Sequence, residues 1–502
     1  MTKKYDVIIV GAGIGGLHAG IYLQSENPGL KTLIVEQNDY PGGYVSGFTI
    51  NGFYFDSAAE TILGYAKSSS RAILQKYDFY HPIHTVEPME AYYNDNHVVR
   101  MFSNPELFLQ DIEKVHPDQS AGVRKLIETS HQIRKDIKEL SLDEGITFGK
   151  LLRIIFKRPV LRKYARKNYK QLLDEFITND EVKDYFKLFS LWFGLKLENL
   201  KAPILAYIIS VAFTEGLYYP EGGMGAFAKK LAELYVTRGG ELRYKSTVKK
   251  ILIEKKTAKS VLLTSGEEIQ ADYIIANSDL HKTIFEYIGK KHFSRRFTDR
   301  IRKIETSMSG VLLYLGIENY DLSKYPAHLM IGRTSDITKN YEENDFNVDG
   351  IAVRIPNNSD KLKARPEKES LIVLTFAPYN WNNFWKIGRN KKRTKEYREL
   401  KKSIIAKIIT KLESFMPNIS KHIKIKRLAT PMTFERFNGS TNGAWYGPKV
   451  NQRLPSFKSQ IKNLFFAGSN VGGSGVQAAM SSGLETGAFL MRKMNKKLLK
   501  EY

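Results

Sequence analysis

Three glycines and one glutamate near the N-terminus have the spacing of a ligand-binding turn. Gly11, Gly13 and Gly16 follow the apolar run Val7–Val10, and Glu36 follows a second apolar run. Glycine at these positions permits a tight turn, brings the main chain close to a phosphate, and lets a helix pack on a strand. A carboxylate about 20 residues beyond the last glycine can accept hydrogen bonds from ribose hydroxyls. The pattern predicts a dinucleotide-binding turn.

The elements that must position these residues are a strand, a helix and a second strand. Val7–Val10 is typical of a buried parallel strand, Leu17–Leu23 continues as a helix, and Lys31–Val35 forms the next strand. The N-terminus of the helix offers N–H groups and a partial positive charge to a pyrophosphate. Because all these elements agree with the glycine spacing, the sequence favours a dinucleotide pocket over a chance glycine turn.

Further glycine-rich segments indicate whether the cofactor is a flavin or a nicotinamide dinucleotide. They occur at Gly42–Gly43, at Gly222–Gly225 before a helix over Ala226–Arg238, and at Gly468–Gly475 between an apolar strand and a small-residue helix, Val476–Arg492. FAD is long and is held at several points, whereas a simple nicotinamide dehydrogenase does not need these segments. No second strand-linked fingerprint occurs in mid-chain. We therefore expect FAD and no separate NAD(P)H domain.

The amino-acid composition further limits the kinds of site and the class of protein that the chain can form. The 502 residues contain no cysteine, which excludes disulfides, thiolate metal sites and cysteine nucleophiles, and favours an intracellular protein. No apolar run approaches the ~18 residues of a membrane span, and no signal peptide precedes the first strand. We expect a cytoplasmic protein that is soluble or bound peripherally to a membrane, and we find no nucleic-acid-binding motif.

The net charge of +24 points to an anionic partner. Basic residues interleave with apolar ones from Lys150 to Lys170 with no acid among them, a pattern that suits an anionic membrane surface. A solvated helix face packed on a core explains the same pattern equally well. A second basic run, Lys386–Lys411, includes Glu396 and Glu399, so a solvated face is the better interpretation there.

The order of strand and helix patterns predicts an α/β protein in which two lobes alternate along the chain. A hairpin over Phe48–Asp56 follows the first pocket, and strands Gly310–Leu315, Ile351–Ile355 and Leu371–Ala377 with a long basic helix form a second, mixed sheet. The expected divisions are 1–103 and 216–306 and 431–502 for the cofactor lobe, 104–215 for a helical substrate or membrane-facing region, and 307–430 for a mixed-sheet substrate domain.

Several motifs, in this order, resemble the phytoene desaturase family of flavoproteins, in particular its branch of carotenoid isomerases and retinol saturases. The resemblance implies a Rossmann-type FAD-binding lobe in an amine-oxidase-like, two-lobed fold. It also implies non-covalent FAD and a long hydrophobic isoprenoid substrate drawn from a membrane. The motifs are the opening fingerprint with Glu36, Pro41–Gly43, Gly52–Asp56, Tyr219–Gly225, Ala271–Ser278, Pro431–Gly439, Gly443–Gly447 and Leu464–Gly483.

The same resemblance implies roles for individual residues along the cofactor. Three positions depart from the family pattern: Tyr44 where many desaturases have arginine, Ala58 where glycine is usual, and Ser469 where an acidic or amide residue is common. The implied contacts are Gly11, Gly13 and Gly16 at the pyrophosphate, Glu36 at the adenosine ribose, Gly42, Gly43 and Ser46 at the phosphates and ribityl chain, Val248 at the adenine through its backbone, and Gly468, Ser469, Gly475 and Val476 at the flavin.

Hydride transfer between a carbon chain and flavin N5 needs no side-chain nucleophile. A proton donor remains to be found, and by family register Glu60 lies near the flavin ring, where burial would raise its pKa. The alternative is that Glu60 caps a helix starting near Thr61. Trp445 and Tyr446 either line an apolar tunnel or pack in the core. The pair His81 and His84 lacks further ligands nearby, so we expect no metal.

We therefore expect an FAD-dependent oxidoreductase that desaturates, saturates or isomerises a carotenoid, retinoid or similar polyisoprenoid. A flavin amine oxidase is one alternative, and a flavin-containing lipid-binding protein without turnover is another. The sequence sets neither the direction of the reaction, nor the electron acceptor, nor the oligomeric state.

Overall fold

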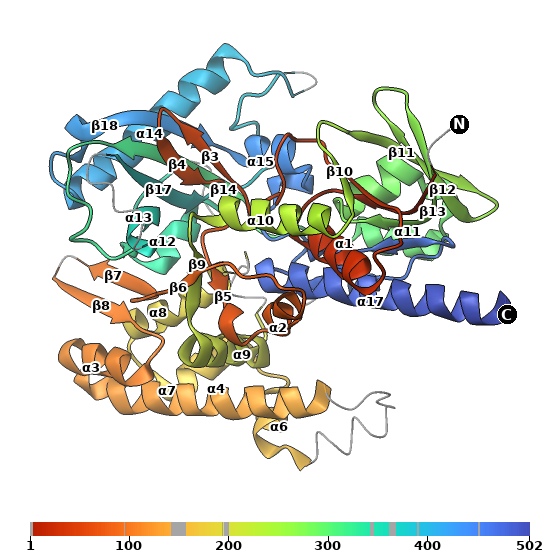
Figure 1. Cartoon of the computed structure of the whole chain (residues 1–502). Helices are drawn as coiled ribbons and strands as arrows, with labels where there is room; N and C mark the ends of the chain where they lie inside the picture. The colour runs from red at the N-terminus through yellow and green to blue at the C-terminus, as the bar shows by residue number, and fades with distance from the viewer. Residues whose placement is uncertain are drawn as a thin grey trace. The chain divides into compact units, whose positions relative to one another are not determined.

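The computed structural model describes residues 4–94, 96–141, 157–192, 194, 200–341, 346–360, 368–388, 391–449 and 452–501. The chain divides into two compact units (Figure 1). Because the chain alternates between them, each unit is assembled from separated segments. Unit 1 comprises Met1–His84, Tyr219–Ser309 and Ala429–Tyr502, and unit 2 comprises Thr85–Tyr218 and Gly310–Leu428.

Unit 1 is built on a sheet of strand order β10-β2-β1-β13-β12-β11, with β19 paired to β13. The strands next to β1 run parallel to it, with Ile8 opposite Leu33 on one side and Ile274 on the other. The carboxyl ends of these parallel strands therefore meet at one edge. The strands are β1 (Lys4–Val10), β2 (Thr32–Val35), β10 (Glu241–Arg243), β11 (Val248–Glu254), β12 (Thr257–Leu263), β13 (Glu268–Ala276) and β19 (Leu464–Phe466).

Helices α1 (Ile14–Glu26) and α17 (Val476–Glu501) lie side by side in unit 1 (Figure 1). Glycine makes this approach possible, because a Cβ on Gly483 would lie 2.1 Å from the carbonyl oxygen of Gly15. Helix α10 (Met224–Thr237) begins after Gly223. The predicted strands and helices around the opening turn, the hairpin β3 (Gly47–Ile50) and β4 (Phe53–Asp56), and the terminal strand and helix are confirmed.

The helix expected near Thr61 is wrong. Residues Ile62–Leu63 form the short strand β5, Gly64 then adopts a left-handed conformation, and helix α2 begins only at Ser69 and extends to Lys76. The side chain of Ser68 accepts a hydrogen bond from the Arg71 N–H, which fixes the start of α2. Glu60 therefore does not cap a helix at this position.

Unit 2 contains a mixed sheet of strand order β18-β14-β17-β16-β15-β7-β8, in which β15 and β7 are parallel. This confirms the mixed sheet expected for the second lobe. Residues 85–103 differ from the expected division, because β7 pairs with β15 and so belongs to unit 2. The strands are β7 (Glu90–Asn94), β8 (His97–Met101), β14 (Gly310–Ile317), β15 (His328–Ile331), β16 (Ile351–Arg354), β17 (Glu369–Phe376) and β18 (Ile423–Ala429).

The described helices of unit 2 confirm the mostly helical character predicted after Asn104. Helix α4 packs among its neighbours with Ser130 and Asp136 buried, and α14 buries Tyr397, Ile404 and Leu412 on one face. The solvated outer face predicted for the second basic run is thus confirmed where it is described. The helices include α3 (Pro105–Val115), α4 (Ser120–Ser141), α6 (Pro159–Tyr164), α7 (Tyr169–Phe176), α8 (Asp180–Leu191), α9 (Ala202–Glu215), α12 (Thr334–Thr338) and α14 (Lys395–Phe415).

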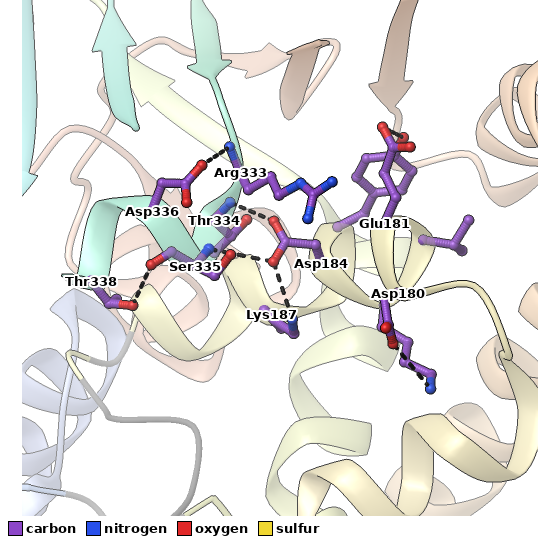
Figure 2. A network of polar contacts seen from close by, with 12 residues as sticks. Asp180, Glu181, Asp184, Lys187, Arg333, Thr334, Ser335, Asp336 and Thr338 are labelled. Atoms are coloured by element: carbon purple, nitrogen blue, oxygen red, sulfur yellow. Dashed lines mark hydrogen bonds and ion pairs between the residues drawn. The ribbon is translucent and has the colours of Figure 1, made fainter. Parts of the chain in front are cut away.

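A buried carboxylate joins α8 to α12 (Figure 2). Asp184 is 4% exposed and accepts hydrogen bonds from the main-chain N–H groups of Thr334 and Ser335, and from Lys187 Nζ at 3.2 Å. The first N–H groups of a helix have no partner within the helix, and a carboxylate satisfies them. Asp184 therefore has a structural role at the start of α12.

A second buried charge pair joins strands of the unit 2 sheet. Glu90 Oε1 accepts a hydrogen bond from Arg354 Nη1 at 2.9 Å, and the two residues are 0% and 6% exposed. His328 Nδ1 donates to the Met89 carbonyl at 3.1 Å. Burial, followed by the charge of Arg354, holds the pKa of His328 well below its ordinary value. The sheet thus contains a paired charge beside a neutral histidine.

Residues 150–156 of the first basic run lie outside the described residues. In the described remainder, Lys163 and Lys167 both form ion pairs with Glu175, while Arg166 and Lys170 are exposed. Part of the positive charge of this run is therefore balanced by an acid elsewhere in the chain. Among the described helices, none combines the length and the apolar character needed to cross a membrane.

Candidate functional site

The opening glycine turn joins three segments of unit 1. Gly11 has φ +99°, and its N–H donates to the Val35 carbonyl at 2.8 Å. The N–H of Gly42 donates to the Ala12 carbonyl at 2.8 Å, and Gly13 forms a bridge with Gly42. The first and second glycine segments are therefore adjacent, as a ligand held by both would require.

Close contacts surround two of the predicted glycines. A Cβ on Gly16 would lie 2.2 Å from the Gly11 carbonyl oxygen, and a Cβ on Gly13 would lie 3.0 Å from Asn277 Nδ2. Real Cβ atoms do not approach a carbonyl oxygen this closely, so a side chain at residue 16 would push α1 away from the turn. This close contact is consistent with the predicted role of Gly16 in helix packing, which stays a prediction.

Asn277 is a residue of this site that the sequence identified only as part of the motif Ala271–Ser278 and to which it assigned no role. It follows β13, and its Nδ2 donates to the Gly11 carbonyl at 3.1 Å. A Cβ on Gly15 would lie 2.7 Å from Asn277 Oδ1, and one on Gly468 would lie 2.5 Å from it. Asn277 therefore lies between the opening turn and the C-terminal glycine segment. Its position directly after a strand pattern was the available signal, because parallel strands end at a common edge.

Glu36 lies at the end of β2 beside the opening turn and is 6% exposed. Oε2 accepts a hydrogen bond from the Ala12 N–H at 2.9 Å, and Oε1 accepts two from Asn38. Burial raises the pKa of this carboxyl, and these hydrogen bonds partly offset the shift. A carboxylate oxygen can accept more than one hydrogen bond, so Oε2 retains capacity for a ribose hydroxyl.

Val248 begins β11 and is 6% exposed. The segment before it contacts the Glu36 main chain, because the Ser246 N–H donates to the Glu36 carbonyl at 2.7 Å. Val248 and Glu36 thus occupy neighbouring segments. This is the arrangement expected if both face the adenosine end of a cofactor, and the contact itself stays a prediction.

The second glycine loop is fixed by hydroxyl groups. Gly42 and Gly43 have φ +103° and +62°. Ser46 Oγ donates to the Gly43 carbonyl at 2.6 Å. Tyr44, at the position that departs from the family pattern, donates to the Ala444 carbonyl at 2.7 Å and lies 2.8 Å from Ser440 Oγ. Tyr44 thus joins the loop to the segment before Trp445.

The C-terminal glycine segment leaves open space in front of α17. Gly473 and Gly475 have φ +95° and +93°, and a Cβ on either would meet no described atom within 4 Å. Val476 is the first residue of α17, so main-chain N–H groups of that helix face this space. The segment suits an electron-rich part of a ligand, as predicted for Gly475 and Val476.

Ser469 lies close to the segment that contains the two predicted aromatic residues. A Cβ on Gly447 would lie 2.8 Å from Ser469 Oγ. The Trp445 N–H donates to the Met308 carbonyl at 3.1 Å, and the Tyr446 N–H donates to Ser307 Oγ at 3.0 Å. The main chain of the aromatic pair is therefore fixed beside the C-terminal glycine segment, while their role in a tunnel stays a prediction.

A buried carboxyl lies four residues before the predicted proton donor. Asp56 is 1% exposed and accepts hydrogen bonds from the Tyr54 and Tyr219 hydroxyls, each at 2.7 Å, and from the Met224 N–H at 2.8 Å. Burial raises the pKa of Asp56 to about 6, and the charge of Glu60 adds to the shift. The sequence identified Asp56 only as part of a motif, and the structure makes it a second carboxyl near Glu60.

The fold and this site define a dinucleotide-binding flavoprotein of the amine-oxidase type. FAD fits the residues present, because two further glycine segments adjoin the opening turn and a Cβ on Gly473 or Gly475, just before α17, would meet no described atom within 4 Å. The family model described as flavin containing amine oxidoreductase matches residues 14–488, and the chain belongs to this family. The predictions of a flavoprotein oxidoreductase and of FAD as its cofactor are confirmed.

Comparison with known proteins supports the narrower resemblance as well. The chain is 26% identical to prolycopene isomerase 1 of an Oncidium hybrid cultivar, over 96% of this chain and 83% of that protein. It is 22% identical to all-trans-retinol 13,14-reductase of Danio rerio, over 98% of this chain and 87% of that protein. The structure of an oxidoreductase from Methanosarcina mazei shares the fold with a TM-score of 0.67 and 14% identity, covering 96% of this chain and 99% of that one.

Proposed function

We propose that this protein is an FAD-dependent enzyme that acts on carbon–carbon bonds of a hydrophobic polyisoprenoid such as a carotenoid or retinoid. The observation that carries the proposal is the near-full-length similarity to a prolycopene isomerase and a retinol reductase. Those two enzymes share a polyene substrate class although they differ in reaction. The substrate class is therefore a firmer part of the proposal than the direction of the reaction.

Bound FAD supplies a hydride acceptor or donor for such a reaction. The protein then has to hold the cofactor, exclude water and manage protons. Gly11–Gly16 and Gly42–Ser46 are suited to the phosphates and ribityl chain, and the N-terminus of α17 is suited to the flavin end. Glu36 and Val248 are suited to the adenosine. These assignments follow the family resemblance and the adjacency of the segments.

The paired carboxyls Asp56 and Glu60 supply a way to hold a proton near neutral pH. A pKa of about 6 leaves Asp56 partly protonated in the physiological range. The two tyrosine hydroxyls that donate to Asp56 fix its orientation. Glu60 is proposed as the proton donor, and its charge adds to the raised pKa of Asp56.

The substrate class also gives a reason for membrane association. A long polyene is stored in a bilayer, and the exposed cations Arg166 and Lys170 belong to the basic run predicted to face anionic lipid. Replacing both by glutamate should abolish co-sedimentation with vesicles that contain phosphatidylserine. Lys163 and Lys167 are already paired with Glu175, so replacing them should have a smaller effect.

The direct test is anaerobic incubation of the purified flavoprotein with phytoene, lycopene isomers and retinol, followed by mass spectrometry and chromatography. Loss of two hydrogens indicates desaturation, gain of two indicates saturation, and a changed retention time at constant mass indicates isomerisation. Bound FAD with every polyene unchanged would overturn the proposal. The Glu60→Gln variant should then retain FAD but lose most of its turnover.

An amine oxidase is the second candidate function, because the family is described as flavin containing amine oxidoreductase. Such an enzyme would release peroxide in air when supplied with primary amines or polyamines, and it would leave polyenes unchanged. A flavin-containing lipid-binding protein without turnover would show neither result, and no substrate would change the redox state of its flavin. The same preparation separates all three functions.

A further inference from the structure

A cluster of metal-ligating side chains lies in unit 2, and none of its residues is among those assigned to the cofactor. His97 begins β8, His116 follows the last residue of α3, and Glu181 lies in the first turn of α8. Their ligand atoms all lie within 4.8 Å of one another. Three elements that are distant in sequence thus present two imidazoles and one carboxylate to a single point.

The distances within the cluster are close to those of a coordination sphere. His97 Nε2 lies 2.8 Å from Glu181 Oε1, and His116 Nε2 lies 3.8 Å from Glu181 Oε2. Ligand atoms of a tetrahedral zinc site with bonds near 2.1 Å are separated by about 3.4 Å. The imidazole rings are nearly perpendicular, at 89°, so both reach the carboxylate without stacking.

A fourth donor completes the set. Tyr185, one helical turn after Glu181, is 4% exposed, and its hydroxyl lies 3.2 Å from His116 Nε2 and 3.4 Å from His97 Nε2. The same hydroxyl lies 3.2 Å from Glu181 Oε1. All four donor groups are therefore mutual neighbours. A set of four without an open position is typical of a structural rather than a catalytic zinc site.

Glu181 does not take part in the contact by which Asp184 joins α8 to α12. Figure 2 shows Asp184 directed toward the start of α12, whereas Glu181 leaves α8 in a different direction. The Glu181 carboxylate accepts a hydrogen bond from Asn94 Nδ2 at 2.8 Å and contacts the histidines and tyrosine of the cluster. Asn94 can remain as an outer hydrogen-bond donor that orients the carboxylate, as second-shell groups do at metal sites.

We propose that His97, His116, Glu181 and Tyr185 form a binding site for a divalent transition-metal ion of the zinc type. Imidazole and carboxylate ligands select zinc over calcium or magnesium, which prefer oxygen ligands alone. The ion would join β8, α3 and α8 and so stabilise unit 2. The proposal does not depend on the substrate or reaction of the cofactor unit, because its residues and its measurement are separate.

The test uses the full-length flavoprotein, freed of metal with a chelator and titrated with Zn²⁺ against a chromophoric chelator. We expect one equivalent of zinc. Since loss of an outer-shell partner alone costs about 10–100-fold in affinity, His97→Asn and Glu181→Gln should each weaken binding at least about 100-fold. Tyr185→Phe keeps the ring and should weaken binding less. Zinc should also raise the thermal unfolding midpoint of the wild-type protein.

His131→Asn provides the matched control. His131 is a partly buried histidine of α4, and its Nδ1 lies 2.9 Å from Ser210 Oγ. The His131→Asn substitution should leave zinc affinity unchanged. Circular dichroism and flavin content verify that each variant is folded. Equal zinc affinity in wild type, His97→Asn and Glu181→Gln would overturn the proposal.

Cobalt substitution gives an independent measurement on the wild-type protein. Co²⁺ in a tetrahedral site absorbs at longer wavelength than the flavin bands, so its spectrum is read beside the bound cofactor. Intense bands that zinc displaces stoichiometrically would support the site even if a variant failed to fold. Their absence at saturating Co²⁺ would overturn it.

Discussion

Buried polar groups at the two sheets of this protein have different kinds of hydrogen-bond partner. At the edge of the unit 1 sheet, the polar groups of the glycine segments are main-chain groups, and the neutral amide of Asn277 bonds to one of them. In unit 2, charged side chains from distant strands and helices meet, as Glu90 meets Arg354. The glycine segments at this edge of unit 1 therefore depend on positions without a side chain, whereas the charge pair in unit 2 depends on the presence of both partners.

The largest expected effect comes from breaking the charge pair in unit 2. Glu90→Ala would leave the guanidinium of Arg354 buried without its carboxylate, which costs about 3–5 kcal/mol of unfolding free energy. Urea unfolding followed by fluorescence measures the loss. Glu106→Ala, which breaks an exposed pair with Arg124, should leave the unfolding midpoint nearly unchanged. Equal effects of the two substitutions would contradict the contrast between buried and exposed pairs.

In unit 1, adding a side chain to a glycine of the opening turn should weaken cofactor binding. Gly16→Ala places a methyl group 2.2 Å from the Gly11 carbonyl oxygen, and overpacking of this kind costs about 1–3 kcal/mol. Since the strain falls on the cofactor turn, the purified variant should lose most of its bound flavin, as read from the visible spectrum. Gly29→Ala, at an exposed turn, should retain flavin. Full flavin content in Gly16→Ala would show that the turn tolerates the displacement.

The buried histidine His18 of unit 1 makes the stability of the protein depend on pH. His18 in α1 is 0% exposed, its Nδ1 lies 2.7 Å from the Ile14 carbonyl oxygen, and burial lowers its pKa to about 4. No described residue offers Nε2 a hydrogen-bond partner. Burial therefore keeps His18 neutral near pH 7.

The sign of the pH effect follows from the lowered pKa. Between pH 6.5 and about 4 the unfolded chain binds a proton that the folded chain does not, so stability is complete above pH 6.5 and falls as the pH drops. The loss attributable to His18 is about 3 kcal/mol over this range. His18→Leu should show a smaller loss of stability than wild type when both are unfolded in urea at pH 7 and pH 4.5. Parallel losses would exclude His18 as the cause.

The smallest effect is expected for the hydroxyl that fixes the second glycine loop. Tyr44→Phe removes the hydrogen bond to the Ala444 carbonyl but keeps the ring, and a hydrogen bond of this kind contributes about 0.5–1.5 kcal/mol. Thermal unfolding and flavin affinity measure the change. Tyr80→Phe, at a residue that is 71% exposed, is the control and should behave as wild type.

The sequence was sufficient for parts of the molecule whose residues are close along the chain. The opening strand, turn and helix lie within Val7–Leu23, so local periodicity and glycine spacing predict them. The role of Asn277 was missed because its contact with Gly11 exists only once β13 pairs with β1. The helix expected near Thr61 was wrong because the left-handed Gly64 interrupts the segment.

Long-range pairing explains the remaining differences. Residues 85–103 belong to unit 2 because β7 pairs with β15, a contact between segments more than two hundred residues apart that no local pattern announces. The cluster of His97, His116 and Glu181 has no motif spacing for the same reason. A short HxxH pair drew attention to His81 instead, which in the structure contacts the Glu221 carbonyl.

The close contact of Gly15 with Gly483 has a consequence for the order in which the protein is made. Helix α1 leaves the ribosome several hundred residues before α17, the helix that packs against it. The surface of α1 that α17 covers must therefore stay uncovered until α17 has been synthesised. The demand for chaperones should consequently be high during this interval, and cofactor loading should follow the synthesis of α17.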